Sequence, residues 1–154
     1  MEAEDDNERT TPIGLFHFAH SYWRSAVALE KAKVKATHRD SPISFLYFHA
    51  MELYLKAFLR LHDVSVEELS KKYRHHVLAL SDAAKTLGFH LDDEDEVVVK
   101  MMDAMDLTDV RYIRTGRFLQ PSHEALHRTC RSFHETVEQA LREKGHPVRR
   151  YETE

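Results

Sequence analysis

The stretch SPISFLYFHAMELYLKAFLR at residues 41–60 decides the fold class, because it is apolar on nearly every side of a helix. Polar side chains interrupt it at four-residue intervals, at Glu52, Lys56 and Arg60. A helix that is apolar except for one narrow polar stripe is typical of the centre of a helical bundle. The charged residues also argue against a membrane-spanning helix, so we expect no membrane association.

Helix start signals flank this stretch on both sides. Thr11 precedes Pro12, Ser41 precedes Pro42, and Ser122 precedes an apolar stripe with helical spacing. A hydroxyl side chain can cap a helix, and proline is favoured at the first helical position. The pattern predicts an all-α fold, an up-and-down bundle of four long helices plus a shorter helix near residues 65–70, with a loop over residues 107–121.

Composition supports one helical domain. The chain has 154 residues, with only 4 Gly and 4 Pro, so an all-β fold built from many tight turns is not expected. We expect a disordered acidic lead over residues 1–10, a single domain over 11–144 and a flexible tail over 145–154. The lone Cys130 cannot form an internal disulfide, which favours a cytoplasmic protein.

Residues 41–60 resemble the signature helix of the HEPN superfamily (higher eukaryotes and prokaryotes nucleotide-binding domains). Members show a small residue, then Glu-Leu, then Leu-Lys-Ala, which correspond here to Ala50, Glu52-Leu53 and Leu55-Lys56-Ala57. A second family element resembles Gly-His-Asp-Leu, and residues 75–78 match it at His76 and Leu78. The likeness extends over roughly residues 13–142, and it implies a HEPN-like helical bundle.

The resemblance also implies a function. Many HEPN proteins are metal-independent endoribonucleases that carry Arg, four to six residues and then His near the start of the last helix, paired across a homodimer. Arg117 and His123 match that motif in the expected place, although active members often have a polar residue where this chain has Phe118. Other members are non-catalytic modules that bind RNA, nucleotide or protein. Some act with a nucleotidyltransferase-type antitoxin partner, in toxin–antitoxin or defence systems.

The residues around this motif suit RNA without reference to any family. The net charge of the chain is −4, yet residues 110–131 contain one acid and five arginines. Arginine suits phosphate, and histidine can transfer protons near neutral pH. RNA supplies its own nucleophile, the 2′-OH, so we expect no cofactor. We therefore predict a catalytic pair, Arg117 and His123, and a phosphate-binding group consisting of Arg111, Arg114, His127 and Arg128.

Two alternatives stay open for these charged residues. The arginines could instead pair with acids elsewhere in the bundle, such as those at residues 92–96. Glu52 and Lys56 could orient catalytic groups, line a contact between protomers, or form a surface stripe on an otherwise buried helix. For His76, an orienting role competes with helix capping or packing.

A third alternative is a divalent-metal site. His123 and His127 are four residues apart, and His49 lies on the central predicted helix. If the bundle brought His49, His123 and His127 together, three imidazole nitrogens could hold a metal ion. DinB-like metal-binding bundles have a comparable arrangement, but they lack the segment Glu-Leu-Tyr-Leu-Lys-Ala at residues 52–57.

Overall fold

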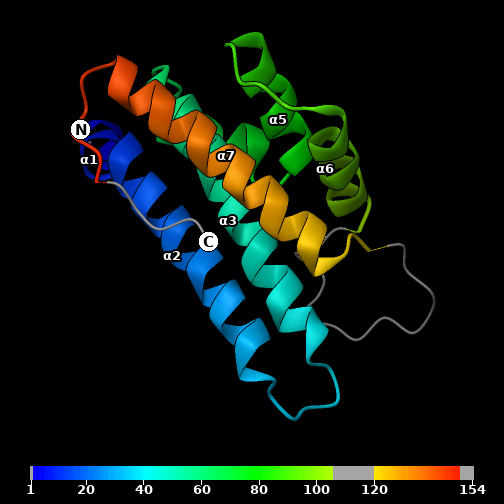
Figure 1. The fold of residues 1–154 in the computed structure, drawn as a ribbon. Helices are drawn as coiled ribbons and strands as arrows, with labels where there is room; N and C mark the ends of the chain where they lie inside the picture. The colour runs from blue at the N-terminus through cyan, green and yellow to red at the C-terminus, as the bar shows by residue number, and fades with distance from the viewer. Residues whose placement is uncertain (1, 106–119, 150–154) are drawn as a thin grey trace.

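A computed structural model describes residues 2–105 and 120–149 of the chain. Within these ranges the secondary structure is helical, with connecting turns and no strand (Figure 1). The predicted all-α helical bundle is therefore confirmed. None of the helices in the described ranges is both long and apolar enough to cross a bilayer. Most of the predicted loop over 107–121 lies outside the described residues.

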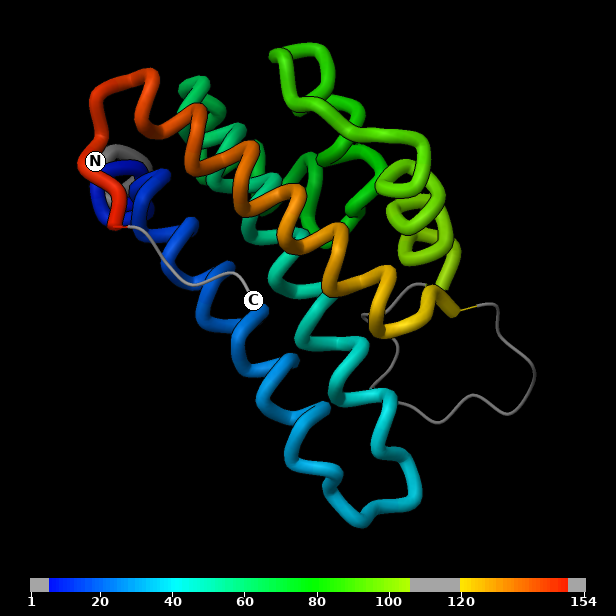
Figure 2. The backbone as a smooth tube through the Cα atoms, viewed as in Figure 1, coloured from blue at the N-terminus to red at the C-terminus, as the bar shows by residue number. Residues whose placement is uncertain are grey.

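Three helices form the centre of the bundle. They are α2 (Pro12–Ala32), α3 (Asp40–Leu61) and α7 (His123–Glu143), and they have 21, 22 and 21 residues. The tube in Figure 2 follows α2 into α3 through a turn at one end of the molecule, so these two helices form a hairpin. Helix α7 packs against both of them.

Two further helices complete the bundle, and one of them packs directly on α3. Helix α5 (Val77–Thr86) packs on α3, and α6 (Asp93–Met105) packs on α5 and α7. Between α3 and α5 the chain forms a short α-helix, α4 (Val66–Glu68), which continues into a five-residue π-helix, η1 (Leu69–Tyr73). Helix α3 is thus covered on several sides, which its apolar sequence requires.

The core contains large aromatic side chains from all three central helices. Phe16, Trp23, Tyr47, Tyr54 and Phe133 are fully buried. Burying a side chain of this size contributes about 1.5–3 kcal/mol to folding. Since the polar tips of Trp and Tyr need partners when buried, this core also contains hydrogen bonds that the apolar pattern alone does not predict.

Two predicted caps are present. Oγ1 of Thr11 accepts a hydrogen bond from the backbone N–H of Gly14 at 3.0 Å, and Oγ of Ser122 accepts one from Ala125 at 3.1 Å. Each satisfies an N–H group that the first turn of a helix leaves without an intrahelical partner. The starts of α2 and α7 therefore follow from local sequence.

The start of α3 differs from the prediction. The helix begins at Asp40, before Ser41, and Arg39 at the cap position makes no side-chain capping bond. Instead, Nη2 of Arg39 donates to the backbone carbonyl of Glu30 near the end of α2, at 2.8 Å. Pro42 is still in the first turn, where its missing N–H is tolerated, so the helix can begin earlier than the Ser-Pro pattern indicates.

The N-terminal segment that was expected to be disordered is helical. Residues Glu2–Arg9 form α1, and Arg60 at the end of α3 donates to the carbonyls of Asn7 and Thr10 at 2.9 and 3.0 Å. Oδ1 of Asn7 accepts from the backbone N–H of Val66 at 2.9 Å. The acidic composition correctly indicates poor core-forming ability, but these tertiary hydrogen bonds attach the segment to the bundle.

The first part of the expected C-terminal tail also contacts the bundle. Val148 is buried, and its carbonyl accepts a hydrogen bond from Nη2 of Arg142 at 3.0 Å. Lys144, just after α7, donates to the carbonyl of Leu61 at 2.9 Å. Residues 145–149 are therefore ordered against the helices, and residues 150–154 lie outside the described part of the chain.

Candidate functional site

Only part of the predicted RNA-facing group lies in the described residues. Arg117, Arg111 and Arg114 fall within residues 106–119, outside the described ranges. His123, His127 and Arg128 are described, all in the first two turns of α7. The structure therefore shows where one member of the predicted catalytic pair lies.

His123 is the first residue of α7 and is half-buried. Its Nε2 lies 3.4 Å from Oγ of Ser44, and its ring centroid lies 6.2 Å from that of Tyr47. Ser44 and Tyr47 are both buried residues of α3. The imidazole is thus held against α3 at the N-terminal end of α7, where free backbone N–H groups favour a bound anion.

Tyr47 connects this region to α2. Its hydroxyl donates to Oε1 of Glu30. Burial and the hydrogen bond to the Glu30 carboxylate raise the pKa of Tyr47 far above its ordinary value. The phenol therefore remains protonated at any physiological pH and acts only as a hydrogen-bond donor to Glu30.

His127 contacts Trp23 of α2 and Arg131 of its own helix, one with each ring nitrogen. Its Nδ1 accepts from Nε1 of Trp23 at 3.0 Å, and its Nε2 lies 3.2 Å from Nη2 of Arg131. Burial, followed by the charge of Arg131, lowers the pKa of His127 below its ordinary value. His127 is therefore a neutral, internally bonded residue, which does not match the predicted phosphate contact. The contact with Trp23, 104 residues away in the chain, could not be predicted from local sequence.

Arg128 is paired with acids at the start of α6. Its Nη1 lies 2.6 Å from Oε2 of Glu94, and its Nη2 lies 3.6 Å from carboxylate oxygens of both Asp92 and Asp95. This is the alternative in which arginines pair within the bundle. Because the charge of Arg128 is already neutralised by three acids, the geometry does not favour a phosphate-binding role.

The predicted metal alternative is wrong. His49 contacts Glu52, whereas His123 contacts Ser44 and His127 accepts from Trp23. In the described ranges, no three His, Cys, Asp or Glu side chains are arranged to hold a metal ion. His123 and His127 do lie one turn apart on the same helix, as their spacing predicts. However, each of the three imidazole rings contacts a different neighbour.

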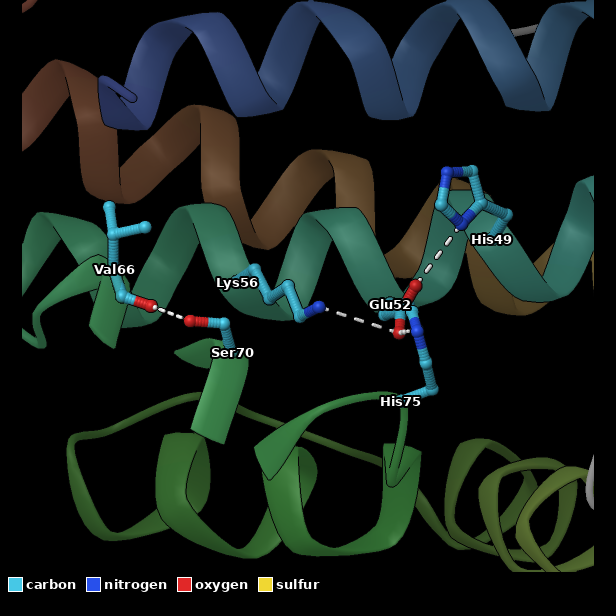
Figure 3. A network of polar contacts seen from close by, with 6 residues as sticks. All are labelled: His49, Glu52, Lys56, Val66, Ser70 and His75. Atoms are coloured by element: carbon cyan, nitrogen blue, oxygen red, sulfur yellow. Dashed lines mark hydrogen bonds and ion pairs between the residues drawn. The ribbon is translucent and has the colours of Figure 1, made fainter. Parts of the chain in front are cut away.

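A second polar group is centred on Glu52, whose side chain is only 1% exposed (Figure 3). Its Oε2 lies 3.1 Å from Nδ1 of His49, and its Oε1 lies 2.5 Å from Nδ1 of His75 and 3.5 Å from Nζ of Lys56. Burial is the largest single influence on Glu52 and raises its pKa. The contacts from His49, Lys56 and His75 outweigh burial and bring the pKa below its ordinary value. Glu52 is therefore an ionised, buried carboxylate.

The histidine that meets Glu52 is His75, and not the family-matching His76. His76 is the residue before α5, is exposed, and makes no side-chain capping bond. Of the alternatives for His76, side-chain capping is not observed, and the contact with Glu52 is made by His75. The His75-His76 pair in the sequence indicates that a histidine lies near the start of α5. Which of the two contacts α3 depends on how the turn before α5 packs against that helix.

Two polar regions thus remain as candidates on the described surface, one at His123 and the other at Glu52. Both regions involve α3. His123 contacts Ser44 of that helix, and Glu52 lies eight residues further along it. Comparisons of the chain with models of known protein families, with characterised proteins and with solved structures find no match.

Proposed function

We propose that this chain is a HEPN-like endoribonuclease that cleaves RNA without a metal ion, with His123 transferring protons and Arg117 stabilising the phosphate. The observation that carries the proposal is the position of His123. Its imidazole contacts Ser44 and Tyr47 of α3, and the residue is only partly buried. Fixing a proton-transfer group in this way is what general acid–base catalysis requires.

The proposed reaction uses RNA as its own nucleophile. A histidine takes the proton of a 2′-OH, and the 2′ oxygen forms a bond to the adjacent phosphorus. The bond from phosphorus to the 5′ oxygen breaks, and that oxygen takes a proton from a second imidazole. The products are a 2′,3′-cyclic phosphate and a 5′-OH, and a permanent positive charge stabilises the pentavalent phosphorane.

Two copies of the chain supply the two imidazoles in this proposal. Each protomer of a homodimer contributes one His123 and one Arg117 to a shared site. The N-terminal end of α7 adds a favourable environment for the phosphate group. Neither His127 nor Arg128 is needed, in keeping with their internal contacts.

The decisive experiment is RNA cleavage in excess EDTA. Wild type should cleave total RNA, and Arg117→Ala and His123→Ala should each lower the rate by about 100-fold or more. Arg128→Ala is the matched control on the same helix and should keep at least half of the wild-type rate. Light scattering of the same samples should give the mass of a dimer.

Failure of the folded wild-type dimer to cleave any RNA would refute the nuclease proposal. Retention of RNA or nucleotide binding in that case would support the second possibility from the sequence, a non-catalytic binding module. Co-purification with a nucleotidyltransferase partner would place either activity in a toxin–antitoxin pair.

A further inference from the structure

His75 combines a fixed position with an accessible side chain. Its Nδ1 lies 2.5 Å from a carboxylate oxygen of Glu52, yet the His75 side chain is 57% exposed. An ionised carboxylate can only accept hydrogen bonds, so Nδ1 of His75 must carry a hydrogen and donate it to Glu52. Nε2 is then the remaining hydrogen-bonding atom of a ring whose orientation the buried carboxylate fixes.

The backbone that presents His75 is in an uncommon conformation. Arg74, directly before it, has φ 48° and ψ −114°, in the positive-φ region that only glycine adopts readily. Such conformations persist where surrounding structure holds them, and they cluster at functional sites. Here the turn between η1 and α5 places the imidazole of His75 against Glu52 of α3.

The surroundings of His75 are basic. Residues 70–76 contain Lys71, Lys72, Arg74 and two histidines, and no acid. Lys71 is paired with Glu67 at 2.9 Å, whereas Nζ of Lys72 lies over the ring of Tyr73. Lys72 and Arg74 are exposed. A ligand that approaches this segment therefore meets positive charge, which selects for an anion.

The charge of Glu52 does not cancel this preference. Nζ of Lys56 lies 3.5 Å from the same Glu52 oxygen that accepts from His75 (Figure 3). Lys56 therefore balances the carboxylate, and His49 satisfies the second oxygen at 3.1 Å. With its own partners complete, Glu52 orients His75 and is not itself available to a ligand.

We propose that His75, together with Lys72 and Arg74 and oriented by Glu52, forms a phosphate-binding site separate from His123. The ligand is a backbone phosphate of single-stranded RNA, a choice that rests on the proposed function. Guanidinium and ammonium groups suit a phosphate charge, and an imidazole Nε2 can donate to it when protonated. Ser44, which contacts His123, is eight residues from Glu52, or about 12 Å along α3, so the two sites are separated along this helix by about two turns.

The test uses binding of a fluorescein-labelled 12-nucleotide RNA with 2′-O-methyl groups, which cannot be cleaved through the 2′ oxygen. Anisotropy at fixed ionic strength should show that His75→Ala weakens binding by about 10-fold, the effect of losing one charged hydrogen bond. Lys72→Ala should also weaken binding and should reduce the slope of log affinity against log salt by roughly 0.7. The matched control is His76→Ala, an adjacent exposed histidine without the Glu52 contact, which should change affinity less than twofold.

A second measurement separates RNA from free phosphate as the source of the anion. Nitrogen NMR of the imidazoles should show the Nε2 resonance of His75 shifting with the RNA, with saturation. A saturable shift with inorganic phosphate and none with RNA would overturn the assignment of RNA as ligand. Equal losses in His75→Ala and His76→Ala, or no loss in either, would overturn the site.

The experiments distinguish failure of the His75 binding site from failure of the proposed nuclease activity. If wild type cleaves RNA and His75→Ala binds it normally, the site is wrong and the nuclease stands. If wild type binds RNA through His75 but cleaves none, the site stands and the nuclease is wrong. Since Glu52→Gln could unfold the bundle, the test rests on His75→Ala, which removes a largely exposed side chain and leaves Glu52 its contacts with His49 and Lys56, with circular dichroism confirming the fold.

Discussion

Nε1 of Trp23 donates a hydrogen bond to Nδ1 of His127 over 3.0 Å, joining α2 to α7 across 104 positions of sequence. This bond favours the neutral imidazole, because a nitrogen that accepts a hydrogen bond cannot also carry a proton. Burial and Arg131 act in the same direction on the pKa of His127. The contact therefore fixes both the charge and the orientation of this histidine.

Replacing Trp23→Phe should raise the pKa of His127 towards its ordinary value, because the variant lacks the indole donor. We also expect a loss of about 1–3 kcal/mol in the free energy of unfolding, from the lost hydrogen bond and the smaller ring. Imidazole NMR titration and urea denaturation measure these two effects. Tyr54→Phe, which removes a hydroxyl beside a different histidine, is the control and should leave the pKa of His127 in place. An unaltered His127 pKa in Trp23→Phe would contradict the bond.

His134 should make the protein less stable in mild acid. Its side chain is fully buried, Nδ1 lies 2.8 Å from the hydroxyl of Tyr54, and burial followed by the charge of His20 lowers its pKa from 6.5 to about 4. Since the unfolded chain binds a proton at higher pH than the folded chain, stability is complete above about pH 6.5. It then falls as the pH drops towards 4, by on the order of 3 kcal/mol.

Urea unfolding at several pH values between 7 and 4 checks this prediction. His134→Gln should flatten the dependence of the unfolding free energy on pH over that range. His90→Gln, an exposed histidine between α5 and α6, should retain the wild-type slope. Equal slopes in wild type and His134→Gln would show that another group causes the acid sensitivity.

Asp95 and Arg128 should contribute to the stability of the fold and not to the affinity for RNA. The buried carboxylate of Asp95 accepts from the hydroxyls of Thr129 and Ser132 at 2.9 and 2.8 Å, and lies near Arg128. Asp95→Ala should cost about 3 kcal/mol, because it leaves buried donors without an acceptor. Arg128→Ala should cost about 1 kcal/mol, because its partners Asp92 and Glu94 are exposed and its contact with the buried Asp95 is long, at 3.6 Å.

Measuring RNA affinity distinguishes a purely structural role of Arg128 from the phosphate-binding role that its place in the sequence predicts. Anisotropy with Arg128→Ala should agree with wild type within twofold. Arg142→Ala, at the other end of α7 and paired with Glu138 at 2.9 Å, provides the comparison for a surface arginine. A drop in affinity specific to Arg128→Ala would restore the phosphate-binding role predicted from its place in the sequence.

Arg60 should hold α1 on the bundle. It donates to the carbonyls of Asn7, Thr10 and Val64 at 2.9, 3.0 and 3.0 Å, a three-way contact that fits a guanidinium. Arg60→Ala should therefore increase amide hydrogen exchange in residues 2–9 by about 10-fold and leave exchange in α7 unaffected. Lys100→Ala, an exposed cation on α6, should change neither. Unaltered exchange in α1 after Arg60→Ala would mean that other contacts hold the segment.

The fold class and most helix starts could be predicted from local sequence. Thr11 and Ser122 satisfy N–H groups three residues ahead, a contact that needs no other part of the chain. The apolar surround of α3 likewise requires a central position whatever the neighbours are. The start of α3 was missed because its stabilising contact, from Arg39 to Glu30, connects two helices.

The sites depended on contacts that local patterns do not encode. Glu52 and Lys56 are four residues apart on one helix, so their proximity could be predicted. The choice of His75 over His76 depends on how the turn before α5 meets α3, and a shift of one residue would exchange the two rings. The pairing of Arg128 with α6 similarly depends on the packing of α6 against α7.

Local sequence was enough to predict the long helices and the central position of α3, because caps and apolar periodicity act over a few residues, but it did not predict α1. Only the tertiary structure decided which polar groups stay available, because each imidazole and guanidinium takes the nearest partner that packing brings to it. Trp23 donates a hydrogen bond to His127, three acids pair with Arg128, and Glu52 orients His75, all across distances in sequence that no local pattern spans.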